Sequence, residues 1–213
     1  MEREEVKYYP AFLNLKDKKA VVIGGGPVAE RKARTLIKAG ASVTVISPSL
    51  TEDLKKLRDK KKLEHIGRDF KKGDLKNAFL VIAATSSATA NTEAARDARF
   101  LINVVDTPSE GNFIAPSIVK RGLLTIAVST EGASPALSKA IRRELEKLYG
   151  KEFALYLKFV ESVRKKAMKR IPDPKKREKF LKSFSSGKIL TAIRGKGLNA
   201  VSGKISASLE STR

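Results

Sequence analysis

The chain has 213 residues, of which 41% are hydrophobic, and this is enough apolar material for one full domain and a smaller appendage. It contains no cysteine, which excludes disulfides and iron–sulfur clusters and suits a cytoplasmic protein. No stretch approaches the roughly 20 apolar residues of a membrane span. The charged residues 1–5 do not resemble the start of a signal peptide. We therefore expect a cytoplasmic protein that makes no membrane contact.

The formal net charge is +21, and it is unevenly distributed. Residues 1–119 carry 21 basic and 15 acidic side chains, whereas residues 120–213 carry 23 and 8, with a peak between 164 and 182. Such a field favours an anionic partner, although a lysine-rich solvated surface is the alternative. We do not expect the partner to be nucleic acid, because the aromatic residues near the C-terminus follow helical core spacing instead of forming a stacking platform.

The first half of the chain alternates between strand and helix patterns. An apolar run ending at three glycines predicts a buried strand over 20–23, and a helical pattern follows from Val28 to Gly40. The next predicted elements, in order, are a strand over 42–46, a helix over 50–61, a weak strand over 63–66, a strand over 79–84, a helix over 89–99 and a strand over 101–105. This alternation indicates an α/β fold with a Rossmann-type parallel sheet in residues 1–110.

The regular alternation of strand and helix patterns ends after residue 108. Two neighbouring strands are predicted over 112–119 and 123–129, and a helix over 136–149 with Ser134 as its N-cap. Two further helical stretches are predicted, one over 153–170 and one around residues 180–184, and the chain beyond Gly195 shows no periodicity. We expect a small α+β domain over 111–149 and a helical C-terminal domain over 150–213 with a frayed tail.

The segment Gly24-x-Gly26-x-x-Ala29 fits the G-x-G-x-x-G/A dinucleotide-binding pattern. Gly24 is expected to make the tight turn, Gly26 to let the backbone approach a pyrophosphate, and Ala29 to permit close packing of helix on strand. The phosphates are then expected at the positive end of the helix that begins near Pro27. Because the pattern follows a strand and precedes a helix, we favour nucleotide binding over a merely structural turn.

The acidic residue that normally holds the ribose about 20 positions further on is missing. The second strand ends in Ser47, Pro48 and Ser49, whose hydroxyls are expected to replace the carboxylate. No arginine stands there to meet a 2′-phosphate, so NAD is favoured over NADP.

Two polar residues are candidates for chemistry. His65 is the only histidine and falls on a weak strand, so we predict neither a histidine proton relay nor a bound metal. Asp106 follows the fifth strand, at the carboxyl edge where open α/β sheets bind ligands. It is therefore a candidate catalytic residue, and a turn-capping role is the alternative.

Several segments together resemble the precorrin-2 dehydrogenase module of siroheme synthases. They cover residues 8 to 149 in order and with sensible spacing, and they comprise Tyr9-Pro10 with Phe12, residues 22–32, Ala83-Ala84-Thr85, residues 103–106, residues 111–116 and residues 128–135. The resemblance implies NAD-dependent oxidation of precorrin-2 to sirohydrochlorin, followed in some members by ferrochelation. It also implies a homodimer formed by the small middle domain, and the apolar segments 113–114 and 123–128 point the same way.

The resemblance also assigns site residues. Asp106 is expected to act as the general base, and Asn112 and Thr130 to contact the substrate. The expected cofactor-binding residues are Gly24, Gly25, Gly26, Pro27, Val28, Ser47, Pro48, Ser49 and Thr85.

The substrate of this family carries eight carboxylates, so basic side chains are expected to line its cleft. Thr130 stands where some relatives have serine, and 213 residues leave no room for the methyltransferase domain of larger members. We therefore expect a stand-alone dehydrogenase. The alternative is a non-catalytic NAD-sensing regulatory domain, which would share the glycine turn but would not require Asp106.

Overall fold

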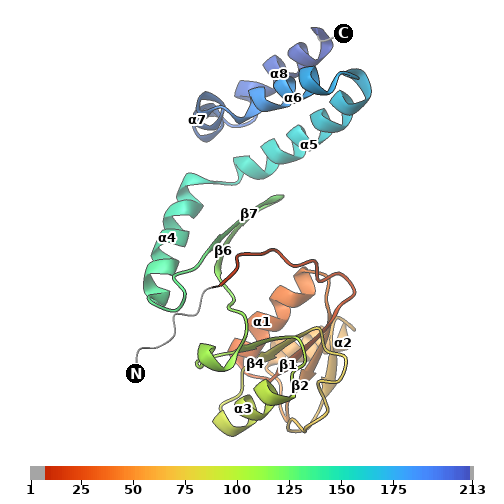
Figure 1. The fold of residues 1–213 in the computed structure, drawn as a ribbon, viewed down its shortest axis with the longest axis vertical. Coiled ribbons are helices and arrows are strands. Elements are labelled where there is room, and N and C mark those ends of the chain that lie inside the picture. Colours follow the sequence, from red (N-terminus) through yellow and green to blue (C-terminus); the bar gives the residue numbers. More distant parts are fainter. Residues whose placement is uncertain (1–7, 212–213) are drawn as a thin grey trace. The chain divides into compact units, whose positions relative to one another are not determined.

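The computed structural model describes residues 8–211 (Figure 1), so the charged segment 1–5 lies outside the described residues. The chain divides into two compact units, Met1–Ala115 and Pro116–Arg213. Within the described range, no helix is both long and apolar enough to cross a membrane. The three-part division expected from the sequence, with a further boundary at 149/150, stays a prediction.

The first unit contains a five-stranded parallel sheet in the order β3-β2-β1-β4-β5, which confirms the Rossmann-type fold. Its strands are β1 (Lys19–Ile23), β2 (Ser42–Ile46), β3 (Glu64–Ile66), β4 (Leu80–Ala83) and β5 (Leu101–Val104). The chain moves outward from β1 to β3 and then returns to the other side of β1 for β4. The direction of winding therefore reverses between β1 and β4, the place where open α/β sheets bind ligands.

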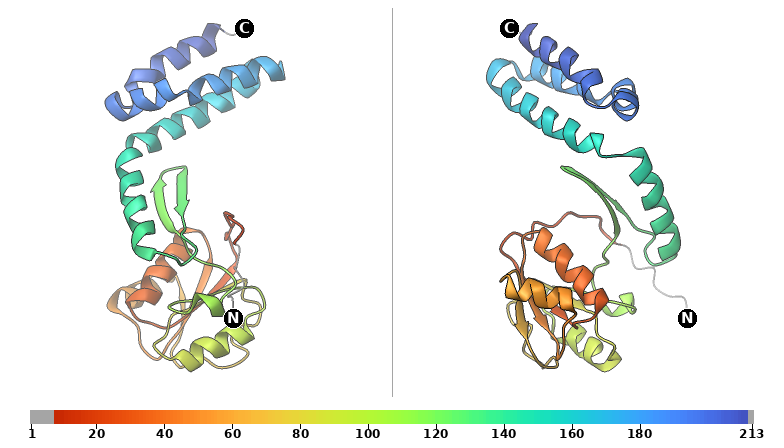
Figure 2. Two further views of the ribbon diagram at one scale, coloured as in Figure 1. Left: turned by 60° about the vertical axis from the view of Figure 1, so that its left-hand side comes forward. Right: turned by 180° about the vertical axis from the view of Figure 1, so that it is seen from behind.

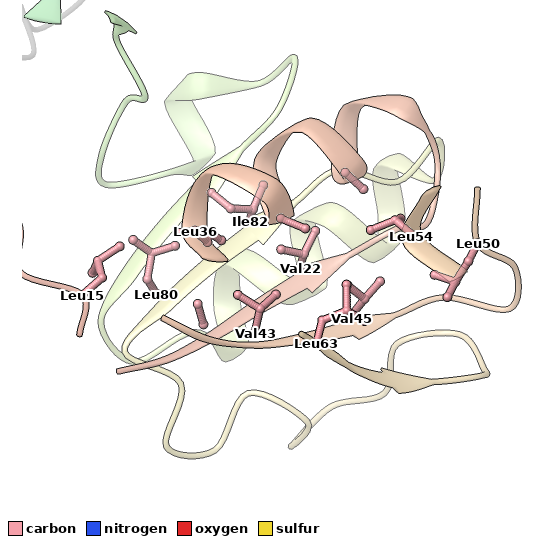
Figure 3. Packing of buried hydrophobic residues seen from close by; sticks show 13 residues of the cluster. Leu15, Val22, Leu36, Val43, Val45, Leu50, Leu54, Leu63, Leu80 and Ile82 are labelled. Carbon is pink, nitrogen blue, oxygen red and sulfur yellow. The ribbon is translucent and has the colours of Figure 1, made fainter. Parts of the chain in front are cut away.

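Helices cover both faces of this sheet, which is why its strands read as continuous apolar runs. Helices α1 (Pro27–Lys38) and α2 (Glu52–Asp59) lie on one face (Figure 2), and Val22, Val45 and Ile82 pack there (Figure 3). On the other, the alternate strand residues pack with Ala94 of α3 (Ala88–Asp97). Two buried layers thus fix the strand ends, and with them the loops at the carboxyl edge.

The second unit begins with an antiparallel hairpin and continues as helices. Ser134 caps the first helix as predicted, because its hydroxyl accepts a hydrogen bond from the Leu137 amide. The elements are β6 (Ser117–Arg121), β7 (Leu124–Val128), α4 (Pro135–Leu148), α5 (Glu152–Arg170), α6 (Pro174–Lys182), α7 (Gly187–Lys196) and α8 (Asn199–Ser211). The strand expected over 112–119 begins only at Ser117, because the preceding residues hydrogen-bond to β5 instead.

The expectation of a frayed tail beyond Gly195 is wrong. Helix α8 occupies this segment, and Val201, Ile205 and Leu209 are buried in the core of the helical unit. These three residues are spaced four apart, so they form one apolar stripe. Small residues such as serine, glycine and alanine fill the positions between them and hide the period in the sequence.

We predict that the substitution Ile205→Ala destabilises the helical unit by about 2–5 kcal/mol, because it leaves a cavity in a closed core. The neighbouring substitution Ser206→Ala lies on the exposed side of α8 and should change the unfolding free energy by less than about 0.5 kcal/mol. Chemical denaturation of the full chain measures both. Equal midpoints for the two variants would show that α8 does not pack as described.

Candidate functional site

A cleft of ≈ 930 Å³ opens at the carboxyl ends of β1, β2 and β4, across the point where the winding reverses. Its volume lies in the range of small-molecule and cofactor sites. The lining includes the glycines 24–26, residues 46–51, Asp69, Phe70, residues 84–87 and the first turns of α3. Asp69 and Glu93 are the charged residues among those that line it, and no lysine or arginine does.

The turn between β1 and α1 uses its three glycines differently. Gly24 adopts φ +115°, and a β-carbon there would lie 2.4 Å from the Ala84 carbonyl oxygen. A β-carbon on Gly25 would lie 1.8 Å from the Ser49 carbonyl oxygen, whereas one on Gly26 would meet no atom within 4 Å. The first two glycines are therefore required by the protein's own packing, and the third leaves open space at the start of α1.

That space is suited to an anion. Gly26 is the N-cap of α1, and no side chain caps the helix there. The first amides of a helix lack intrahelical partners and carry partial positive charge, so an uncapped start favours a phosphate. Pro27 and Val28 begin the helix but do not line the cleft. A pyrophosphate thus fits this turn, because backbone can approach it and no side chain competes for the amides.

The Ser47–Ser49 loop follows β2 and is held by its neighbours. The Ser47 hydroxyl donates to the Ser49 carbonyl (2.8 Å), and His65 Nε2 lies 2.8 Å from the Ser47 carbonyl oxygen. The Thr51 amide donates to the Gly25 carbonyl (3.0 Å). The Ser47 hydroxyl is therefore engaged within the loop. His65 has a structural contact that the sequence did not indicate, since β2–β3 pairing brings it there.

A polar network fastens this loop to α1. Glu30 accepts hydrogen bonds from the Thr51 hydroxyl (2.6 Å) and from Arg34 (2.9 Å), and Arg34 also pairs with Asp53 of α2 (2.8 Å). The Thr51 hydroxyl and then the Arg34 guanidinium lower the pKa of Glu30. The network ties the start of α2 to the first turn of α1, so the two turns that border the cleft form one assembly.

Thr85, on the loop after β4, also lines the cleft, and Asn91 of α3 holds it in place. The buried Asn91 side chain accepts from the Thr85 amide (3.3 Å) and hydroxyl (3.0 Å) and donates to the Thr85 carbonyl (3.1 Å). Sequence reasoning missed Asn91. An asparagine within a helical pattern gives no sign that it braces a loop six residues earlier.

Asp106 lies two residues beyond β5, the strand next to β4. It is exposed and adopts φ +71°, in the left-handed region that few non-glycine residues occupy. Its carboxylate has no hydrogen bond or ion pair with any residue in the described part of the chain. Turn capping by the carboxylate therefore does not account for this aspartate, which is one of five described non-glycine residues with a positive φ.

The two other predicted site residues have structural partners. Asn112 accepts from the Ile102 amide and donates to the Phe100 carbonyl, so its amide group is bound to the edge of β5. The Thr130 hydroxyl organises the loop before α4, where it donates to the Ser134 carbonyl and accepts from the Ser134 amide. Both side chains are explained by these contacts, and their roles toward a substrate stay predictions.

Among residues 8–211, no group of three or more histidine, cysteine, aspartate or glutamate side chains is arranged to hold a metal ion.

Comparison with known proteins identifies the two parts of the chain. Residues 11–117 match a family model described as NAD(P)-binding, and residues 121–148 match the sirohaem biosynthesis protein central domain. The chain is 36% identical over 159 residues to a precorrin-2 dehydrogenase from Bacillus subtilis, an alignment that covers 74% of this chain and 98% of that protein.

Longer relatives match over part of their length. The chain is 38% identical over 185 residues to a siroheme synthase from Thioalkalivibrio sulfidiphilus, covering 85% of this chain and 38% of that protein. It is 35% identical over 191 residues to one from Chromobacterium violaceum, covering 88% and 41%. The chain thus spans about two fifths of the length of these siroheme synthases.

The fold is also shared with a solved structure. The structure of SirC, a precorrin-2 dehydrogenase, superposes with a TM-score of 0.82 at 24% identity and covers 95% of this chain and 99% of that one. By sequence and by family model, the chain belongs to the family of precorrin-2 dehydrogenases and siroheme synthases.

Proposed function

We propose that the protein oxidises precorrin-2 to sirohydrochlorin with NAD as the oxidant. The observation that carries this proposal is Asp106, an exposed residue with a left-handed backbone, whose carboxylate has no partner among the described residues and which follows β5, the strand next to β4. The alignment covers 98% of the Bacillus subtilis relative, whose name states this activity, and this supports the reaction and substrate. The lack of cysteine supports a cytoplasmic location as a further part of the proposal.

The cleft would hold the cofactor in an extended form across the sheet edge. The pyrophosphate would lie at Gly26 and the first amides of α1, with the adenosine ribose beside the Ser47–Ser49 loop and the nicotinamide toward Thr85. When bound, NAD supplies the hydride acceptor for the reaction. The protein supplies fixed backbone donors and the two braced loops.

Asp106 would remove the proton from the ring carbon that becomes part of the new double bond. Asp106 follows β5, which pairs in parallel with β4, so it would lie at the same sheet edge as the cleft, although it is not among the residues that line the cleft. An unpartnered carboxylate is free to accept a proton, as a general base must be.

The carboxylates of the substrate need a different environment from the cofactor cleft. No lysine or arginine is among the described residues that line the cofactor cleft, so the expectation that basic side chains hold the substrate concerns another surface and stays a prediction. Precorrin-2 would therefore approach from the Asp106 side of the edge and meet basic residues elsewhere on the chain.

The proposal also includes a homodimer that is formed through the β6–β7 hairpin and α4. Only Val119 is buried in the β6–β7 hairpin, and a two-stranded sheet has little stability by itself. Large apolar side chains on this hairpin and on α4 remain exposed within one chain, namely Ile118 (42%), Leu123 (60%), Leu137 (52%) and Leu148 (42%). A second copy would cover them.

The substitution Gly26→Asp should abolish NAD binding measured by calorimetry, because it places a carboxylate where the pyrophosphate would lie. The fold should survive, since a β-carbon at Gly26 meets no atom within 4 Å. Gly187→Asp is the matched control, because it adds the same charge at an equally open glycine in the first turn of α7. Unchanged NAD affinity in Gly26→Asp would refute the placement of the cofactor.

The substitution Asp106→Asn should lower the rate of sirohydrochlorin formation by about a hundredfold or more, because it removes the base. Asparagine tolerates the left-handed backbone, so NAD affinity should stay near wild type. Asp17→Asn is the control, since Asp17 also has a positive φ (+60°) in the turn before β1. Near-normal turnover in Asp106→Asn would remove this residue from the mechanism.

Wild type and Asp106→Asn also serve to test metal insertion. We expect the wild type not to speed cobalt or iron insertion into sirohydrochlorin beyond the spontaneous rate. A clear acceleration by wild type that Asp106→Asn loses would instead assign both steps to one carboxylate.

The double substitution Ile118→Asp and Leu137→Asp should convert the dimer to a monomer in light scattering at micromolar concentration, because it buries charge in an apolar interface. Met168→Asp, on an equally exposed methionine of α5 (54%), should leave the dimer intact. A wild type that is already monomeric would contradict the proposal.

A further inference from the structure

The acidic residue missing after β2 has a counterpart one strand away. Strands β2 and β3 are paired with Ile46 opposite Ile66, so the segments that follow them leave the sheet at the same edge. The segment after β2 is the Ser47–Ser49 loop, and the segment after β3 carries Asp69. Both line the cleft. Parallel pairing thus brings a carboxylate to the end where the adenosine ribose would lie.

The Asp69 carboxylate is available for a ligand. The residue is exposed, and its side chain makes no hydrogen bond or ion pair with any residue between 8 and 211. Its backbone is nonetheless held, because Arg68 Nη1 donates to the Asp69 carbonyl oxygen (2.9 Å). Because the Asp69 carboxylate has no partner among these residues and its backbone is held in place, it can accept hydrogen bonds from the two hydroxyls of a ribose.

The neighbouring basic residue, Arg68, forms an ion pair with Asp74. The two terminal nitrogens of Arg68 donate to the two carboxylate oxygens of Asp74 at 2.7 and 2.8 Å, and Asp74 also accepts from the Lys71 amide. This pairing raises the pKa of Arg68 and lowers that of Asp74. Bidentate pairs of this geometry are strong. Arg68 is not among the residues that line the cleft, and its positive charge is paired with the Asp74 carboxylate.

The charge of the cleft contrasts with that of the whole protein. The chain carries a large positive net charge, yet none of the basic residues between 8 and 211 lines the cleft. The 2′-phosphate of NADP would therefore meet the Asp69 carboxylate with no basic residue among those that line the cleft, whereas the free diol of NAD can donate hydrogen bonds to it. Hydrogen bonding to the ribose of NAD and repulsion of the 2′-phosphate of NADP would both favour NAD over NADP.

We propose that Asp69 is the residue that determines cofactor specificity, accepting hydrogen bonds from the ribose hydroxyls of NAD and repelling the 2′-phosphate of NADP. The inference deepens the proposed function, on which it rests, because it concerns the same cofactor site.

Calorimetry of NAD+ and NADP+ binding to the full-length protein tests this assignment. Wild type should prefer NAD+, and Asp69→Asn should reduce the ratio of the NADP+ to the NAD+ dissociation constant by about tenfold, as expected for loss of a charge-assisted contact and a repulsion. Asp69→Arg should reduce the ratio further by adding a partner for the phosphate. Glu64→Gln, which removes one negative charge from β3 outside the cleft, should leave the ratio unchanged.

Thermal unfolding checks that each variant is folded, and the outcomes separate the two proposals. A wild type that binds neither dinucleotide overturns the proposed function and this inference with it. A wild type that binds both equally, or a ratio that is the same in wild type, Asp69→Asn and Asp69→Arg, overturns only the role of Asp69. A change of equal size in Glu64→Gln would also overturn it, because the effect would then be that of net charge.

Discussion

The site depends on one close contact between two backbone turns. Gly25 approaches the Ser49 carbonyl so closely that no β-carbon fits, and the Thr51 amide donates to the Gly25 carbonyl at the same place. This contact sets the distance between the start of α1 and the loop after β2. Since the first would hold the pyrophosphate and the second would lie beside the ribose, the spacing of the cofactor's parts would be set by the main chain. The Glu30 network then keeps the two turns together.

The sheet order explains why residues far apart in sequence act at one edge. Strand β1 lies between β2 and β4, so the loop after β2 and the loop after β4 border the cleft from opposite sides of β1. Strand β5 extends the edge, and Asp106 follows it two residues beyond its end. The strained backbone of Asp106 costs of order 1–3 kcal/mol. The buried layers on both faces of the sheet supply the stability that tolerates this strain.

Local signals in the sequence predicted the elements that such signals determine. The apolar runs of the central strands, the glycine turn and the Ser134 cap follow from short-range rules, and all are present in the structure. Neighbour relations were harder to foresee. Asp69 and His65 reach the cleft loop only through β2–β3 pairing, and Asn91 braces a loop through a helical turn. Helix α8 was missed because small polar residues weaken its apolar period.

The protein offers anions two different environments. One is the cleft, which no described basic side chain lines, and the other is the basic surface between residues 164 and 182. A phosphate held by uncharged backbone amides would form no ion pair with a side chain, so changes in ionic strength would have less effect on that interaction. The exposed basic residues between 164 and 182 behave oppositely, since mobile ions screen them over a Debye length of about 8 Å at physiological ionic strength. Salt thus weakens the long-range attraction of the surface for anions more than it would weaken the hold of backbone amides on a pyrophosphate.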